Sequence, residues 1–143
     1  MRVLSVSISE KKGVKKHPVE YINLIEDYGI EGDAHAGKWH RQVSLLGVES
    51  MEAMKEKLPT LSAGDFAENI LTEGIVLYEL PIGTILKVGE CTLEVTQIGK
   101  ECHHGCEIRH IVGDCVMPRE GIFTKVLKGG KIKAEDKIEI VEK

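Results

Sequence analysis

The sequence predicts a mainly β, barrel-like domain with one or two short helices. Two observations lead to this fold class: short apolar runs typical of strands recur along most of the chain, and turn residues separate nearly all of them. One segment has clear helical spacing, so helices are not expected to form a layer of their own. The 143 residues, 42% of them hydrophobic, fit a single domain over residues 1–143.

The first predicted strand covers residues 3–9, where Leu4, Val6 and Ile8 alternate with serines. This is the period-two pattern of a half-buried strand. Residues 11–18 hold four lysines, a glycine and a proline, and are expected to form a solvated loop. Another short apolar run follows at residues 42–46.

The predicted helix comes next. Apolar residues recur there at roughly helical spacing, at Val48, Met51, Met54 and Leu58. Pro59 is expected to end the helix, because the residue before a proline is disfavoured in the helical conformation. The methionines are expected to fill core space rather than bind a ligand.

The second half of the chain is predicted to be strands joined by turns. Gly89-Glu90 has the length of a two-residue hairpin connection. Gly129-Gly130 and Glu135-Asp136 are predicted to bracket another hairpin near the C-terminus. The strand-like runs are residues 69–71, 84–88, 91–98, 122–127 and 137–141.

The overall charge and hydropathy narrow the classes of function. A formal net charge of −4 gives no basic footprint for nucleic acid or for an anionic membrane. The apolar runs are too short to span a bilayer, and the N-terminus lacks the apolar stretch of a signal peptide. We therefore expect a cytoplasmic protein whose four cysteines are reduced thiols, ligands or catalysts rather than a disulfide framework.

A cluster of cysteine and histidine follows the run at residues 91–98. Cys102, His103, His104 and Cys106 fall within five positions of one another. Cys102 lies beside Lys100 and the histidines, whose positive charge would stabilise a thiolate, so it is the candidate reactive residue. Cys91, in contrast, shares a strand face with apolar residues and is expected to be structural.

A metal site is the alternative interpretation of this cluster. In a helix, Cys102, Cys106 and His110 would share one face, and Cys115 could fold back to complete a zinc or iron–sulfur site. The Cys-x3-Cys spacing departs from the usual Cys-x2-Cys zinc knuckle, and Gly105 disfavours a helix there.

A second group of candidate residues lies at positions 29–45. Three glycines permit tight turns and close approach to a ligand. Several side chains could donate hydrogen bonds to a phosphate or carboxylate: His35, Lys38, His40 and Arg41. Arg119 follows Cys115 on a predicted turn and is a further candidate anion contact. A plain solvated loop is the alternative interpretation of the glycine-rich stretch.

Five segments in order carry a resemblance to a known family. They are GIEGDAH at 29–35, RQVSL at 41–45, GDFAENI at 64–70, LPIG at 80–83, and QIG at 97–99 ahead of Cys102. In this combination the chain resembles the MOSC domain, the molybdenum cofactor sulfurase C-terminal domain, and within it the small stand-alone bacterial type.

The resemblance implies a distorted, closed barrel of the pyruvate-kinase-barrel type. It also implies that Cys102 carries sulfane sulfur as a persulfide, for delivery to a metal–sulfur or molybdopterin centre. His35, Arg41 and Asn69 fall in motif segments thought to surround the same cleft. With Lys38 and Arg119, they are the candidate residues for binding the molybdenum cofactor.

The chain lacks the pyridoxal-phosphate-dependent desulfurase domain of fused family members, so no pyridoxal phosphate is expected here. Any sulfurtransferase-type activity would then need a cysteine desulfurase as a separate donor, and a molybdenum-cofactor enzyme or biosynthesis protein as acceptor. A non-catalytic molybdopterin carrier is a further alternative, beside a zinc or iron–sulfur module.

Overall fold

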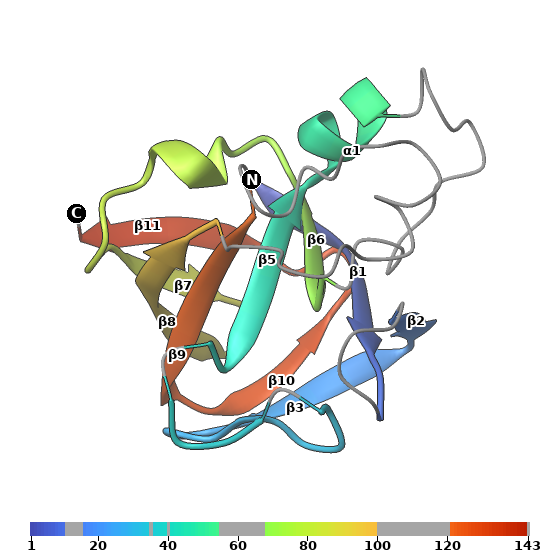
Figure 1. Ribbon diagram of the computed structural model, residues 1–143, viewed down its shortest axis with the longest axis vertical. Helices are drawn as coiled ribbons and strands as arrows, with labels where there is room; N and C mark the ends of the chain where they lie inside the picture. The colour runs from blue at the N-terminus through green and yellow to red at the C-terminus, as the bar shows by residue number, and fades with distance from the viewer. Residues whose placement is uncertain (11–15, 35, 40, 55–67, 100–120, 143) are drawn as a thin grey trace.

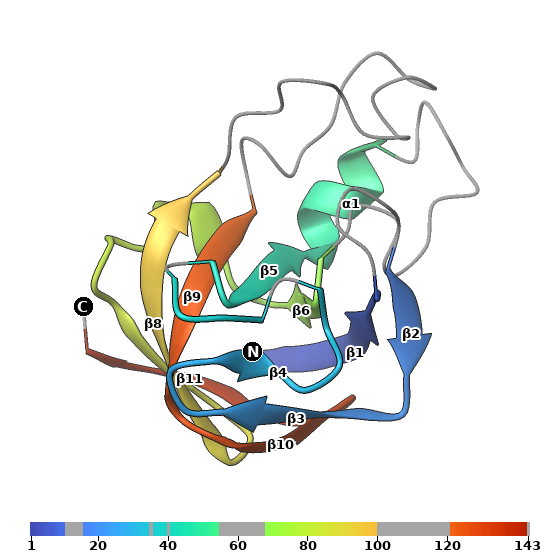
Figure 2. The ribbon, with the colours of Figure 1, turned by 60° about the horizontal axis from the view of Figure 1, so that its bottom comes forward.

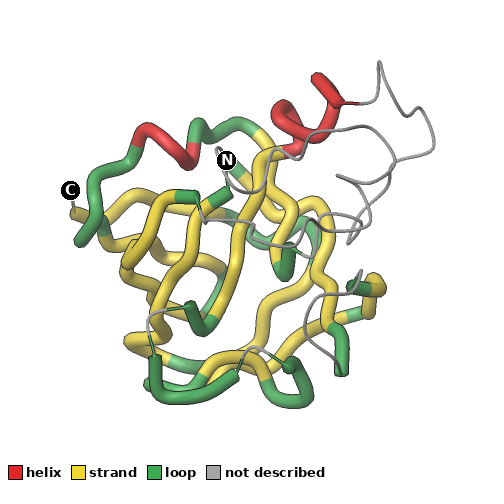
Figure 3. The backbone as a smooth tube through the Cα atoms, viewed as in Figure 1, coloured by secondary structure: helices red, strands yellow, loops and turns green. Residues whose placement is uncertain are grey.

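The computed structural model describes residues 1–10, 16–34, 36–39, 41–54, 68–99 and 121–142. Strands make up most of this part of the chain (Figure 3). The elements are β1 (Arg2–Ile8), β2 (His17–Val19), β3 (Tyr21–Ile25), β4 (Gly29–Ile30), β5 (Val43–Gly47), α1 (Val48–Met54), β6 (Ile70–Glu73), the 3-10 helix η1 (Leu77–Glu79), β7 (Ile85–Val88), β8 (Cys91–Ile98), β9 (Ile122–Lys128), β10 (Gly130–Lys133) and β11 (Ile138–Glu142). The mainly β fold class is therefore confirmed.

The strands form two sheets. The larger has eight strands in the order β11-β7-β8-β9-β5-β6-β1-β2, and the smaller has three in the order β10-β3-β4. All these pairings are antiparallel except that of β5 with β6, which is parallel. The helix α1 lies between these two strands in the sequence. Figure 1 shows β8, β9 and β5 side by side, and Figure 2 shows β3 and β10 next to β1.

The main core lies between the two sheets and alternates along each strand. In β8, Cys91, Leu93 and Val95 are fully buried while the residues between them are partly exposed. The small sheet contributes residues such as Ile22 and Ile132, which are paired across β3 and β10. Burial raises the pKa of the Cys91 thiol to about 12, so Cys91 is an unreactive core residue, as predicted.

Closure of the barrel is not confirmed. The strand β1 meets the chain between β10 and β11 through an isolated bridge, Arg2 with Lys137, and the main-chain N–H of Val3 donates to the Asp136 carbonyl at 2.8 Å. No continuous ladder joins β1 to β11 in the described residues, and the small sheet stays separate. A turn occupies this edge of β1, so a strand cannot pair along it.

The predicted C-terminal hairpin is wrong. The strand β10 pairs with β3, whereas β11 pairs with β7 in the larger sheet. The turn between them directs the chain from one sheet to the other: Glu135 has a φ of 77°, and the Asp136 carboxylate accepts a hydrogen bond from the Lys133 N–H at 3.0 Å. The other hairpin, β7 to β8 through Gly89-Glu90, is confirmed.

Other differences between the predicted and observed elements concern where elements begin and one strand that was not predicted. Within the predicted loop at 11–18, residues 17 and 18 belong to β2, and β3 was not predicted although its burial alternates residue by residue. The helix α1 begins at Val48 as predicted, and its Met51 is buried, but Leu58 and Pro59 lie outside the described residues. No helix within the described ranges is long and apolar enough to cross a bilayer.

Candidate functional site

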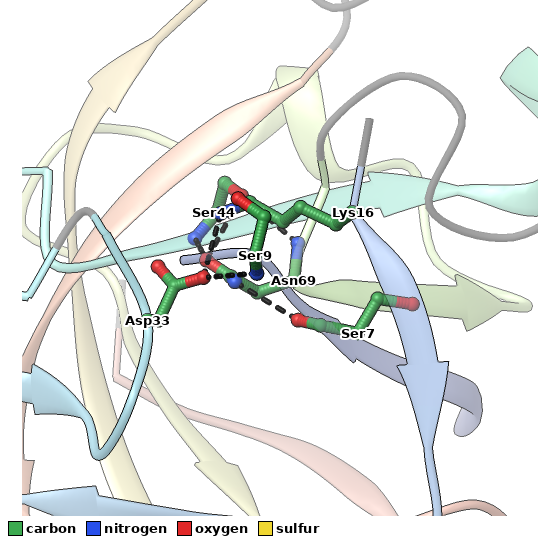
Figure 4. A network of polar contacts seen from close by, with 6 residues as sticks. All are labelled: Ser7, Ser9, Lys16, Asp33, Ser44 and Asn69. Carbon is green, nitrogen blue, oxygen red and sulfur yellow. Dashed lines mark hydrogen bonds and ion pairs between the residues drawn. The ribbon is translucent and has the colours of Figure 1, made fainter. Parts of the chain in front are cut away.

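A buried ion pair fastens the glycine-rich segment to the start of the chain (Figure 4). Lys16 Nζ lies 2.7 Å from Asp33 Oδ1, and both side chains are fully buried. The same carboxylate oxygen accepts a hydrogen bond from the Ser9 N–H at 3.1 Å, and the Ala34 N–H donates to the Ser9 carbonyl. The GIEGDAH segment is therefore anchored from within, because a charge buried this deeply needs a partner.

Asn69 joins three strands of the larger sheet (Figure 4). Its Oδ1 accepts hydrogen bonds from the N–H and the hydroxyl of Ser44, at 3.0 and 3.1 Å, and its Nδ2 donates to the Ser7 carbonyl at 3.0 Å. The side chain is 1% exposed. Asn69 thus precedes β6 and ties it to β5 and β1, and its amide is used by the protein itself.

The second residue of the RQVSL segment is a glutamine that supports the fold. Gln42 is fully buried; its Oε1 accepts from the Val126 N–H at 2.9 Å, and its Nε2 donates to Asp27 Oδ1 at 3.2 Å. Lys125 lies 3.4 Å from the same carboxylate oxygen. The hydrogen bond from Gln42 is the main cause that lowers the pKa of Asp27, and the charges of Lys125 and Lys38 act in the same direction.

This lowered pKa predicts a pH dependence of stability. Because the folded-state pKa of Asp27 lies below its ordinary value of 3.8, the ionised carboxylate stabilises the fold above that value, and this contribution is lost as the pH falls through the folded-state pKa. Urea unfolding of wild type and Asp27→Asn should differ at pH 7 and converge in acid. A difference that stays constant into acid would contradict the assignment.

Close packing explains one of the glycines in this region. Gly29 has a φ of +127°, and a Cβ placed there would lie 2.9 Å from the Gln42 carbonyl oxygen and 3.2 Å from Ala36 Cα. Only glycine fits both the backbone conformation and this approach. The start of β4 therefore lies directly against Gln42, the residue that follows Arg41.

Arg41 lies near two aromatic rings and is bonded at one edge by an amide. Its guanidinium carbon lies 5.8 Å from the centre of the Trp39 ring and 5.3 Å from that of Phe123. Its Nε donates to Gln97 Oε1 at 3.0 Å. Within the described part of the chain its two Nη atoms make no further hydrogen bond, so the fork that binds carboxylates and phosphates is available.

Gln97, the hydrogen-bond partner of Arg41, lies where β8 ends and β9 begins. We call this region the neck; it consists of residues 97–99 and residues 121 and 122. Gln97 Nε2 donates to the Gly99 carbonyl at 2.7 Å, and the Gly99 N–H donates to the Gly121 carbonyl at 2.7 Å. In the sequence, residues 100–120, which contain Cys102, connect the two halves of this neck, and they lie outside the described residues. The geometry therefore joins the RQVSL segment to the base of the cysteine-containing segment.

The structure places only some of the predicted site residues, and these lie in different surroundings. Lys38 is exposed, and its charge acts on Asp27. Arg41 lies at the neck, whereas Asn69 is inside the fold. No group of three potential metal ligands occurs in the described ranges. The remaining candidates lie outside the described residues: His35, His40, Cys102, Cys106, His110, Cys115 and Arg119.

Two contributors to this region were not predicted from the sequence, Gln97 and the pair of Lys16 with Asp33. Gln97 did carry a signal, because simple alternation would place it on the buried face with Leu93 and Val95. A polar residue at such a position can indicate a β-bulge. Lys16 looked like one of several solvated lysines, and nothing in its local sequence distinguishes it.

These features define a class: a small, mainly β domain that presents an arginine, supported by two aromatic rings, at the base of a cysteine-containing segment. The profile of the MOSC domain matches residues 32–139, and the chain belongs to the MOSC domain family. This family is linked to molybdenum-cofactor sulfurase-related functions.

Solved structures share the fold. The YuaD protein of Bacillus subtilis is 17% identical with a TM-score of 0.80, over 96% of this chain and 93% of that one. YiiM from Geobacillus stearothermophilus is 19% identical with a TM-score of 0.76, over 99% and 75%. YiiM from Escherichia coli is 21% identical with a TM-score of 0.70, over 100% and 71%. No protein of curated function matches the sequence.

Proposed function

We propose that this chain is a cytoplasmic sulfur-carrier and molybdenum-cofactor-binding module in which Cys102 holds sulfane sulfur as a persulfide. The observation that carries the proposal is the hydrogen bond from Arg41 to Gln97, which holds Arg41 at the neck that precedes and follows the segment with Cys102 in the sequence. Membership of the MOSC domain family supports the same class of function.

The residues at the neck fit the anionic part of the proposed cofactor. Molybdopterin carries a phosphate, and an arginine with two free Nη atoms binds such a group through paired, charge-assisted hydrogen bonds. Arg41 and Lys38 are described donors for it, and His35 and Arg119 are further candidates. Asn69 fits less well, because its amide is already bonded within the sheet. When bound, the cofactor would supply the metal centre to which sulfur is delivered.

The proposed transfer is an exchange between sulfur atoms. The Cys102 thiolate attacks the terminal sulfur of a persulfide on a donor protein; a new S–S bond forms at Cys102, the donor's S–S bond breaks, and the donor leaves as a thiolate. A thiolate of the acceptor then attacks the same terminal sulfur; a new S–S bond forms on the acceptor, the S–S bond at Cys102 breaks, and Cys102 leaves as a thiolate. The donor would be a cysteine desulfurase, and the acceptor a molybdenum-cofactor enzyme or biosynthesis protein.

This proposal predicts where sulfur is loaded. Incubation with a cysteine desulfurase and cysteine should add the mass of one sulfur atom to Cys102, detected by mass spectrometry of the intact protein and its peptides. Cys102→Ser should abolish the addition. Cys91→Ala should retain it, since the Cys91 thiol is buried with a raised pKa. Loading that is unchanged in Cys102→Ser would sink the carrier role.

Elemental analysis separates this proposal from a metal site built of Cys102, Cys106, His110 and Cys115. Protein purified without chelator should be folded and free of stoichiometric zinc or iron. Stoichiometric metal that disappears on substitution of Cys106 or Cys115 would favour the metal-binding module instead. Cofactor binding that survives Cys102→Ala, without any sulfur loading of wild type, would indicate a non-catalytic carrier.

A further inference from the structure

We infer that Gln97 is a positioning residue that orients Arg41 to receive an oxyanion. This inference deepens the proposed function and rests on it. Gln97 Oε1 accepts from Arg41 Nε at 3.0 Å, while Gln97 Nε2 donates to the Gly99 carbonyl at 2.7 Å. Because the Gly99 carbonyl can only accept, the amide nitrogen must face it, and the amide oxygen is thereby turned toward Arg41.

A register shift in the sheet brings Gln97 to this position. Val95 pairs with Thr124, but Gln97 pairs with Phe123, so β8 carries one residue more than β9 between these pairs. Residues paired across antiparallel strands point to the same face, and an extra residue turns the following side chain to the other face. Gln97 therefore lies on the face of Phe123, the ring that also supports Arg41.

Among the described residues, the contacts of Arg41 leave one edge of its guanidinium without a hydrogen bond. The Trp39 and Phe123 rings lie near the guanidinium, and Gln97 accepts the hydrogen bond from Nε; together these contacts restrict rotation about the end of the side chain. The edge formed by the two Nη atoms is the part of the guanidinium that this hydrogen bond does not use. An arginine ordered in advance loses less conformational entropy on binding, so a tetrahedral or planar oxyanion is bound more tightly than by a free arginine.

Binding of inorganic phosphate tests the inference. Isothermal titration of wild type, Arg41→Gln and Gln97→Met should show no binding for Arg41→Gln and a dissociation constant about tenfold higher for Gln97→Met, as expected when a hydrogen bond to a charged group is lost. Thr84→Val is the matched control: it removes a buried hydroxyl bonded to the Pro81 carbonyl, away from Arg41, and should leave the affinity unchanged.

The exchange rate of the Arg41 Nε–H with solvent, measured by nuclear magnetic resonance, is a second test. This rate would not change if Gln97 served only to stabilise the fold. This proton should exchange slowly in wild type and quickly in Gln97→Met. Gln97→Glu keeps an acceptor for Nε and should restore slow exchange, while its negative charge competes with phosphate and lowers the affinity.

Each outcome is decisive. If Arg41→Gln abolishes phosphate binding but Gln97→Met binds as wild type does, the positioning role of Gln97 is overturned and the oxyanion site stands. If wild type binds no phosphate, or Arg41→Gln binds as well as wild type, the oxyanion site at Arg41 is wrong and the inference with it. Sulfur loading of Cys102 is measured independently of phosphate binding. Failure of the carrier role can therefore be distinguished from failure of the Gln97 role and from failure of the oxyanion site at Arg41.

Discussion

Replacing Lys16 with methionine is expected to destabilise the fold by about 3–5 kcal/mol, the cost of leaving one member of a buried ion pair without its partner. Lys16 and Asp33 are both fully buried and 2.7 Å apart, so solvent cannot compensate the remaining Asp33 carboxylate. Urea denaturation at pH 7, extrapolated to water, measures the loss.

The double variant Lys16→Met/Asp33→Asn should recover most of that loss. The asparagine amide is neutral and retains an acceptor for the Ser9 N–H, which Asp33 bonds in the wild type. Replacing a buried ion pair by neutral groups of similar volume is often close to neutral in stability. The double-mutant cycle therefore separates the cost of an unpaired charge from the loss of packing.

An exposed ion pair in the same sheet provides the control. Arg2 Nε lies 2.9 Å from Glu73 Oε1, but these side chains are 43% and 46% exposed. Solvent screens such a pair, so Arg2→Met should lower the free energy of unfolding far less than Lys16→Met does. A Lys16→Met variant no less stable than Arg2→Met would show that the buried pair does not anchor the GIEGDAH segment.

The strands that the sequence predicted best are those whose two faces differ in polarity. The strand β8 alternates apolar and polar residues over most of its length, and its predicted and observed bounds agree. The strand β3 reads YINLI, so its alternating burial is hidden by exposed apolar residues such as Tyr21 and Ile25. Period-two patterning fails where the outward-facing residues are also apolar.

Pairing partners are harder to predict than strands, because periodicity fixes the faces of a strand and says nothing of its neighbour. The predicted C-terminal hairpin failed for this reason: a turn at Glu135 and Asp136 is compatible both with a hairpin and with a passage between sheets. In the candidate site, the sequence predicted a role for Arg41 but not for Gln97, because the orientation of Gln97 depends on a register shift in β8.

Asn69→Ala is the other substitution with a large expected effect, and it also tests the role that the family resemblance implied for this residue. The change leaves the Ser44 N–H and the Ser7 carbonyl without their side-chain partner inside the sheet. At roughly 1–3 kcal/mol for each of these two buried polar groups, the free energy of unfolding should fall by about 2–6 kcal/mol.

Thr72→Val in the same sheet is the matched control for Asn69→Ala. Thr72 is equally buried, but its hydroxyl makes a single long contact of 3.5 Å to the Leu46 carbonyl, so its removal should change stability little. Phosphate titration of Asn69→Ala under conditions where it is folded then separates two roles. Because the Asn69 amide is engaged by β1 and β5, the folded variant should bind phosphate as wild type does; a large loss of affinity with little loss of stability would instead make Asn69 a ligand contact.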